Sequence, residues 1–163
     1  MNDVDFGGLT PEALFAKREG TSDYEGVYLG YVNAYYNGEA IDAQPMVCIG
    51  VKGDADLDGI VGISDATEVL TYYANSAAGI KASLTENPAN PVYETLAYFL
   101  AGVGTESKEG MNVDGIDKLG INDATYILTY YAQSAAGLVP EWDHIIPSLK
   151  DHVGSLWFER ENG

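Results

Sequence analysis

Two stretches of the chain have nearly the same sequence: residues 62–79 read GISDATEVLTYYANSAAG, and residues 120–137 read GINDATYILTYYAQSAAG. Fourteen of the 18 aligned positions are identical, at a constant offset of 58 residues. Chance does not produce a match of this length, and such internal repeats mark one structural unit that occurs twice. The sequence therefore predicts a duplicated unit around which the rest of the chain is organised.

Each copy has the periodicity of an amphipathic helix that ends at a glycine. Apolar residues recur at steps of three and four, which is the spacing of one helical face. Gly79 and Gly137 end the two helices, as expected for glycine in the left-handed conformation beyond a helix. Because neither helix can bury its apolar stripe alone, we expect the two to pack together around a pseudo-two-fold axis. The predicted stripes are Ala66, Val69, Leu70, Tyr73, Ala74 and Ala77, and Ala124, Ile127, Leu128, Tyr131, Ala132 and Ala135.

The residues before the first helix have the spacing of a calcium-binding loop. Loop positions 1, 3, 5 and 12 are Asp54, Asp56, Asp58 and Asp65, and position 6 is Gly59. Alternate side chains of a tight turn point to one side and offer hard oxygen ligands, while the glycine permits the sharp reversal. The backbone carbonyl of Ile60, at position 7, is expected to add a ligand. Without a cation, carboxylates this close would repel one another, so the pattern predicts a metal site.

The loop before the second helix departs from this pattern. Asn112, Asp114 and Asp123 keep oxygen ligands at positions 1, 3 and 12, and Lys118 stands at position 7. Position 5 is Ile116 and position 6 is Asp117, where a glycine is expected. Either Asp117 swings in as the missing ligand through an altered turn that Gly115 permits, or this loop is weak or metal-free. We favour the first alternative and expect two calcium sites.

Further elements are expected on either side of the repeats. Residues 91–101 follow Asn90, begin with a proline and end before Gly102, so they predict a helix that packs on the two repeat helices. Residues 27–36 and 43–51 are strand-like and joined through an Asn-Gly turn, and residues 10–17 predict a short helix. The tail is too apolar to be disordered and is expected to fold back as a short helix or clasp. Its apolar residues are Trp142, Ile145, Ile146, Leu149, Leu156, Trp157 and Phe158.

A duplicated loop G-D-x-D-x-D-G-x-x-x-x-x-D, followed by one helix and preceded by none, resembles a dockerin. An ordinary EF-hand has an entering helix and a Glu at position 12. Here residues 44–53 form a strand-like run, and position 12 is Asp in both units. Dockerins attach cellulosomal enzymes and scaffoldins to cohesins in a calcium-dependent manner. The resemblance implies a mainly α dockerin fold, with two loop–helix calcium motifs packed antiparallel and a connector helix.

The Asp-Ala-Thr and Leu-Thr-Tyr-Tyr segments most resemble dockerins of ruminococcal cellulosomes that follow an X module. We therefore divide the chain into a β-rich, X-module-like region, complete or partial, at 1–50 and a dockerin at 51–163. Within the dockerin we distinguish repeat one (51–79), a connector (80–110), repeat two (111–137) and a tail (138–163).

In dockerins, the residues that face the cohesin lie just before the last ligand and on the outward helical face. By position these are Ile63, Ser64, Thr67, Leu70 and Thr71 in the first unit, and Ile121, Asn122, Leu128 and Thr129, flanked by Tyr126, in the second. Leu70 and Leu128 also lie at the edge of the predicted core stripe, so both assignments stay open for them. This face is neutral and apolar, which favours a hydrophobic interface. The unequal loops and the X-like region favour one docking orientation of a 1:1 complex.

Charge and composition exclude several classes of function. The chain has 163 residues, of which 25 are Asp or Glu and 8 are Lys or Arg, giving a net charge of −17. This charge disfavours nucleic acids and anionic membranes as partners, and no apolar run is long enough to insert into a membrane. Cys48 is the single cysteine of the chain, so an internal disulfide is excluded. It is expected to be a buried strand residue. His144 and His152 have no second ligand at metal spacing and are expected at the surface or half-buried.

Three functional classes compete, and we expect a non-catalytic calcium-folded adhesion module. A calcium sensor would need entering helices and Met-rich grooves, and a glycoside hydrolase would need carboxylates that a cation does not occupy. The alternative to a dockerin is an EF-hand-like calcium module of another extracellular protein without a cohesin partner. The start of the chain has no basic n-region or apolar h-region, so no signal peptide is expected in it. The resemblance implies a location in a cellulosome or on the bacterial cell surface.

Overall fold

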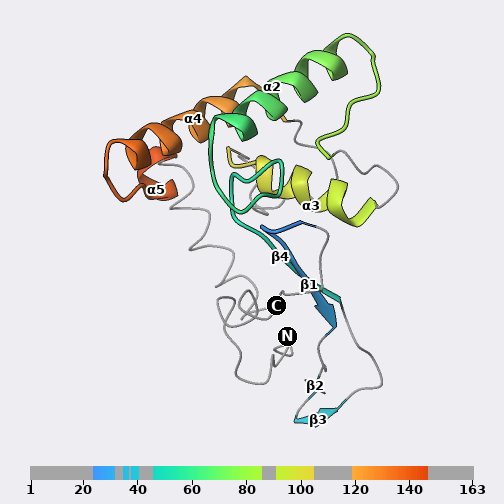
Figure 1. Ribbon diagram of the computed structural model, residues 1–163. Helices are drawn as coiled ribbons and strands as arrows, with labels where there is room; N and C mark the ends of the chain where they lie inside the picture. Colours follow the sequence, from blue (N-terminus) through green and yellow to red (C-terminus); the bar gives the residue numbers. More distant parts are fainter. Residues whose placement is uncertain are drawn as a thin grey trace.

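The computed structural model describes residues 24–31, 35–36, 38–40, 46–85, 91–104 and 119–146. Four helices and two small antiparallel sheets make up this part of the chain (Figure 1). The helix expected at residues 10–17, most of the second loop, His152 and the tail beyond residue 146 lie outside the described residues. In the described part, no helix is both long and apolar enough to cross a bilayer.

The β-structure lies at the N-terminal end and consists of two narrow ribbons. Strand β1 (Tyr28–Tyr31) pairs antiparallel with β4 (Met46–Ile49), and β2 (Tyr35–Tyr36) pairs with β3 (Glu39–Ala40). Gly38 has a φ of 82°, as expected where an Asn-Gly turn joins two strands. The predicted strands are present in part: residues 27–36 contain β1 and β2, and residues 43–51 contain β4. The prediction that the Asn-Gly turn joins these two stretches was wrong, because the turn leads from β2 into β3, which was not predicted. A strand, rather than a helix, enters the acidic loop.

Cys48 lies in β4 as expected, but the prediction that it is buried was wrong. Its side chain is exposed. A two-stranded ribbon gives each residue neighbours on one side only, so an apolar stretch of sequence is not sufficient to bury every residue in it. Desolvation nevertheless raises the pKa of the thiol, which disfavours the nucleophilic thiolate form.

The two repeat helices, α2 (Ile63–Ala77) and α4 (Ile121–Ala135), form the main packing contact between elements. Figure 1 shows that they run in opposite directions and overlap along their first halves. Each ends at the predicted glycine: Gly79 and Gly137 have φ angles of 72° and 77°. The amides that follow these glycines donate to Asn75 and Gln133, which closes both helices in the same way.

The predicted apolar stripes were right for the first half of each helix and wrong for the second. Ala66, Val69, Ala124 and Ile127 are buried. Leu70, Tyr73, Ala74 and Ala77 are exposed in the first unit, as are Leu128, Ala132 and Ala135 in the second, where Tyr131 is half-buried. The reason is geometric, because the C-terminal halves extend past each other in opposite directions and have no partner helix to cover them.

Helix α3 (Pro91–Ala101) confirms the predicted connector helix and closes the core from a third side. The ring of Tyr98 meets that of Tyr72 from α2 edge-on, at 5.6 Å between centroids. The Tyr98 hydroxyl also accepts a hydrogen bond from the Leu119 amide at the entry to α4 (3.2 Å). Glu94 accepts bonds from the amides of Leu84 and Thr85, which ties the segment after α2 to this helix.

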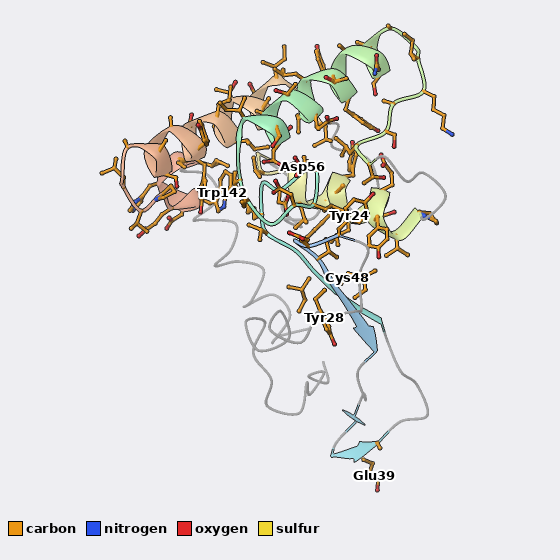
Figure 2. The ribbon with its side chains drawn as sticks, viewed as in Figure 1. Tyr24, Tyr28, Glu39, Cys48, Asp56 and Trp142 are labelled. Carbon is orange, nitrogen blue, oxygen red and sulfur yellow. The ribbon has the colours of Figure 1, made fainter. Side chains whose placement is uncertain are left out.

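The short helix α5 (Trp142–Ile145) confirms that the start of the tail folds back on the helices. The indole of Trp142 stacks on Tyr130 with centroids 4.4 Å apart and an interplanar angle of 19°. The ammonium of Lys52 lies 5.8 Å from the same ring. Figure 2 shows Trp142, the first residue of α5, next to α4. The tail therefore contacts both repeat units, and Ile146 is buried in the common core.

Candidate metal centre

The loop between β4 and α2 is held in place at its start by the core. The amide of Gly53 donates to the carbonyl of Leu100 at the end of α3 (2.8 Å), and the Asp54 amide donates to Val51 (3.1 Å). Leu57 and Gly59 then adopt left-handed conformations, with φ angles of 65° and 92°. This backbone reversal is the one that the glycine at loop position 6 was expected to permit.

Carboxylates at loop positions 1, 3 and 5 fold inward over the turn. Asp54 accepts hydrogen bonds from the amides of Asp58 (3.0 Å) and Gly59 (2.8 Å). Asp56 accepts from Asp58 (3.1 Å), and Asp58 accepts from Ile60 (2.7 Å). These bonds orient all three side chains toward the inside of one short loop, and Figure 2 shows Asp56 there, between β4 and α2.

The three carboxylates form a group that could hold a metal ion. Asp54, Asp56 and Asp58 each offer an oxygen, and these oxygens lie within 4.8 Å of one another. Asp54 is fully buried, Asp56 is half-buried and Asp58 is exposed. A set made only of carboxylate oxygens fits a hard divalent cation and does not fit a soft one, which prefers thiolate or imidazole ligands.

Asp65, predicted at loop position 12, lies beside this group but is engaged with the backbone. It is fully buried at the start of α2. One of its oxygens accepts from the amides of Ala55 (2.6 Å) and Asp56 (3.2 Å), and the other accepts from Gly62 (2.7 Å). Asp65 therefore connects the first half of the loop to the first turn of the helix. Its role as a ligand stays a prediction, as does that of the Ile60 carbonyl.

The electrostatics of the loop favour protonation. The pKa of Asp54 is raised to about 7, mainly by burial and also by the charges of Asp65, Asp56 and Asp58, while the bond from Gly59 opposes the shift. Burial likewise raises the pKa of Asp65 to about 6, with the charge of Asp56 acting in the same direction and its backbone bonds opposing it. A cation among these oxygens would remove both the repulsion and the cost of burying charge.

The second unit repeats the helix start, and only Asp123 of its five predicted metal residues is described. Asp123 is buried and accepts hydrogen bonds from the amides of Gly120 and Gly104, both at 2.9 Å. The bond from Gly120 matches the one from Gly62 to Asp65. Asn112, Asp114, Asp117 and Lys118 lie outside the described residues, so both alternatives for this loop stay open.

A basic residue of the first unit approaches Asp123 of the second. Burial lowers the pKa of Lys52, and the nearby charge of Asp123 partly opposes that shift. Lys52 comes just before the first loop, so it connects the two units electrostatically. No pattern in the sequence marks this lysine for such a role.

Most of the residues predicted to face a partner lie at the surface. Ile63, Ser64, Thr67, Leu70, Thr71, Ile121, Asn122 and Leu128 are exposed, and Tyr126 and Thr129 are half-buried. Leu70 and Leu128 are each 40% exposed, which excludes the core alternative that the sequence left open for them. Thr125, which the offset of 58 residues makes the counterpart of Thr67, is also exposed, and the prediction did not include it.

A second group of possible metal ligands lies at the start of α5. Glu141, Asp143 and His144 offer ligand atoms within 4.8 Å of one another, so the expectation that His144 has no partner at metal spacing was wrong. The Nδ1 atom of His144 lies 3.4 Å from a Glu141 oxygen. The group spans only four residues of sequence, and two of its members are exposed, so water solvates these charges without help from an ion.

Comparisons with known proteins leave the chain without a family assignment. Neither the models of protein families nor the curated proteins gave a match.

Proposed function

We propose that this chain is a calcium-dependent dockerin, which binds a cohesin and thereby anchors its parent protein in a cellulosome or on a bacterial cell surface. One observation carries the proposal. An acidic loop with three clustered carboxylates leads directly into a helix that packs antiparallel on a second copy of itself, and the same positions of both copies are exposed and apolar.

The chemistry of the loop supports calcium as the cation. Three carboxylates, one of them fully buried, repel one another and are costly to keep charged when no cation is bound. Calcium takes six to eight oxygen ligands and tolerates irregular geometry, whereas magnesium requires near-octahedral sites and keeps its waters. Asp54, Asp56 and Asp58 would hold the ion, with Asp65 and the Ile60 carbonyl as further ligands. The ion supplies positive charge that fixes the loop and the start of α2.

The symmetry of the exposed residues supports a docking face. Ile63 is 54% exposed and its counterpart Ile121 is 55% exposed, while Leu70 and Leu128 share the value of 40%. Duplicated helices that bury the same positions and expose the same apolar ones present two equivalent surfaces. Isolated exposed apolar residues are common, but a repeated set is typical of an interaction surface.

Charge also favours a partner that recognises this surface by apolar contact. The chain carries a net charge of −17, yet the exposed positions of α2 and α4 named above are uncharged. Depletion of charged residues is characteristic of the buried centre of protein–protein interfaces. The acidic residues outside this face would form its rim and discourage non-specific contacts.

The position of the loop explains how calcium controls docking in this proposal. Ile63 and Ser64 are the first residues of α2, immediately after the loop. Asp65 in the same turn accepts hydrogen bonds from loop amides. Residues at the start of the helix can be held for a partner only when the loop itself is ordered. Calcium would therefore act as a structural ion, and the module would have no catalytic role.

Calcium-dependent binding to cohesins tests the proposal. The full chain is stripped of metal and titrated calorimetrically against purified cohesins from ruminococcal and other cellulosomes, with calcium or with chelator. We expect at least one cohesin to bind tightly in calcium only. Tight calcium binding without any cohesin partner would favour the alternative, an EF-hand-like module of another extracellular protein. Failure to bind calcium would refute both.

A further inference from the structure

The segment before β1 lies directly on the acidic loop. We call residues 24–27 the docking segment. The amide of Gly26 donates to the carbonyl of Leu57 in the middle of the loop (3.0 Å), and the Val27 amide donates back to Tyr24 (3.3 Å). Val27 is fully buried in the same core as Leu57. Tyr24 packs edge-on against Tyr93 of α3 with centroids 4.6 Å apart, and Figure 2 shows it near this helix.

The contact between the docking segment and the loop leaves no room for a side chain. A Cβ atom added to Gly26 would overlap the amide nitrogen of Gly59 and lie 2.5 Å from an oxygen of Asp54. A Cβ atom added to Gly59 would approach the Gly26 Cα to 3.1 Å. Two glycine backbones therefore face each other where the loop reverses.

The groups at this contact are those that shape the metal centre. The Gly59 amide is the donor to Asp54, with a distance of 2.8 Å, so displacing Gly59 would also displace the buried carboxylate. The Leu57 carbonyl accepts the hydrogen bond from the Gly26 amide. Leu57 has a φ of 65°, a conformation that residues with a Cβ rarely adopt. Its burial and the bond from Gly26 help to keep it in that conformation.

We propose that Gly26 is a positioning residue of the metal centre, so that docking of residues 24–27 and cation binding at Asp54, Asp56 and Asp58 are thermodynamically coupled. The inference rests on the proposed function only in taking calcium as the cation. The coupling is reciprocal: the docked segment raises the affinity of the loop for calcium, and bound calcium stabilises the docked segment. The region before residue 51 would therefore respond to calcium without ligating it.

A matched pair of glycine substitutions in the full chain tests the coupling. Gly26→Ala adds a methyl group against the loop. Gly50→Ala also adds one methyl group to a glycine near the core, but this group would meet the side chain of Leu100 instead of the loop. For both variants and the wild type, the calcium dissociation constant is measured by competition with a chromophoric chelator. Thermal unfolding is measured with and without calcium.

We expect Gly26→Ala to weaken calcium binding at least about tenfold, the order of loss seen when groups that orient metal ligands are removed. We expect Gly50→Ala to lower the unfolding temperature while its calcium dissociation constant stays within about twofold of the wild type. Its methyl group would meet the end of the Leu100 side chain, whereas the bond that holds the loop is to the Leu100 carbonyl. An equal loss of affinity in both variants, or no loss in Gly26→Ala, would overturn the coupling.

Hydrogen exchange of the wild type tests the reciprocal effect without any substitution. If the coupling exists, calcium slows exchange of the Gly26 amide more than that of amides in β3. Equal exchange with and without calcium, in a protein that binds calcium, would overturn the inference and leave the proposed function intact. A wild type that binds no calcium would instead overturn the proposed function, and the inference with it.

Discussion

The acidic loop predicts that the stability of the calcium-free protein falls as the pH rises. The pKa of Asp54 is raised to about 7 in the folded protein, from an ordinary value of 3.8 that we take for the unfolded chain. Between these two values the folded state binds more protons than the unfolded state. The free energy of unfolding therefore decreases with pH in this interval, and the stability present below about pH 4 is lost as the pH rises through about 7.

The size of the effect follows from the pKa of Asp54. At 1.36 kcal/mol for each pH unit, a pKa near 7 instead of 3.8 corresponds to an upper bound of about 4 kcal/mol. Asp65 titrates in the same direction, with a pKa of about 6, but repulsion among these acids contributes to both values, so the two effects do not add. About two pH units of this interval lie above pH 5, Asp58 is exposed and water reaches part of the loop, so between about pH 5 and about pH 8 we expect a decrease of about 1 to 3 kcal/mol.

Urea unfolding of metal-stripped protein at about pH 5 and about pH 8, followed by near-UV circular dichroism, measures this change. Saturating calcium should abolish the decrease, because the bound ion stabilises the charged carboxylates. Asp54→Asn should reduce the pH dependence to the part that Asp65 contributes, and Asp58→Asn, a matched change at an exposed position, should alter it far less. A calcium-free protein equally stable or more stable at the higher pH would refute the reasoning.

Three further predictions concern the helix start, the docking face and the core. Asp65→Ala leaves three backbone amides without their acceptor, so we expect the free energy of unfolding to fall by at least about 2 kcal/mol. We also expect calorimetry to show loss of calcium binding, and unchanged calcium affinity would exclude a role at the metal centre. Ile121→Asp should weaken cohesin binding about tenfold or more with unchanged calcium stoichiometry, because this exposed side chain would enter an apolar interface. Joint loss of cohesin and calcium binding would show that the substitution disrupts the second unit and would not support a contact with the partner. Ile127→Ala should lower the free energy of unfolding in urea by about 2 to 5 kcal/mol, and Leu128→Ala should lower it by less than about 1 kcal/mol. The reverse order would place Leu128 in the core, as the helical period allows.

Local patterns accounted for the elements whose causes are local. The 3.6-residue period predicted both repeat helices, and Gly79 and Gly137 marked their ends because glycine adopts the left-handed conformation easily. Proline and a following apolar stripe predicted the helix at 91–101. The spacing of Asp54, Asp56 and Asp58 predicted their convergence, since alternate residues of a tight turn face the same side.

Long-range contacts determined what the patterns did not. The period could not show which half of each stripe is covered, because coverage depends on how far α2 and α4 overlap, and this overlap leaves Leu70 and Leu128 exposed. Cys48 was predicted to be buried from its apolar neighbours, but burial depends on what lies over a strand.

By itself, the sequence determined that one loop–helix unit occurs twice, that its first loop gathers carboxylates, and that its helices end at glycines. These properties depend on residues within about a dozen positions of one another, so spacing alone carries them. Only the tertiary structure decided that Gly26 lies against Gly59 and that Leu70 and Leu128 stay outside the core. Such contacts join residues more than 30 positions apart or depend on how two helices cross, and no local spacing encodes either.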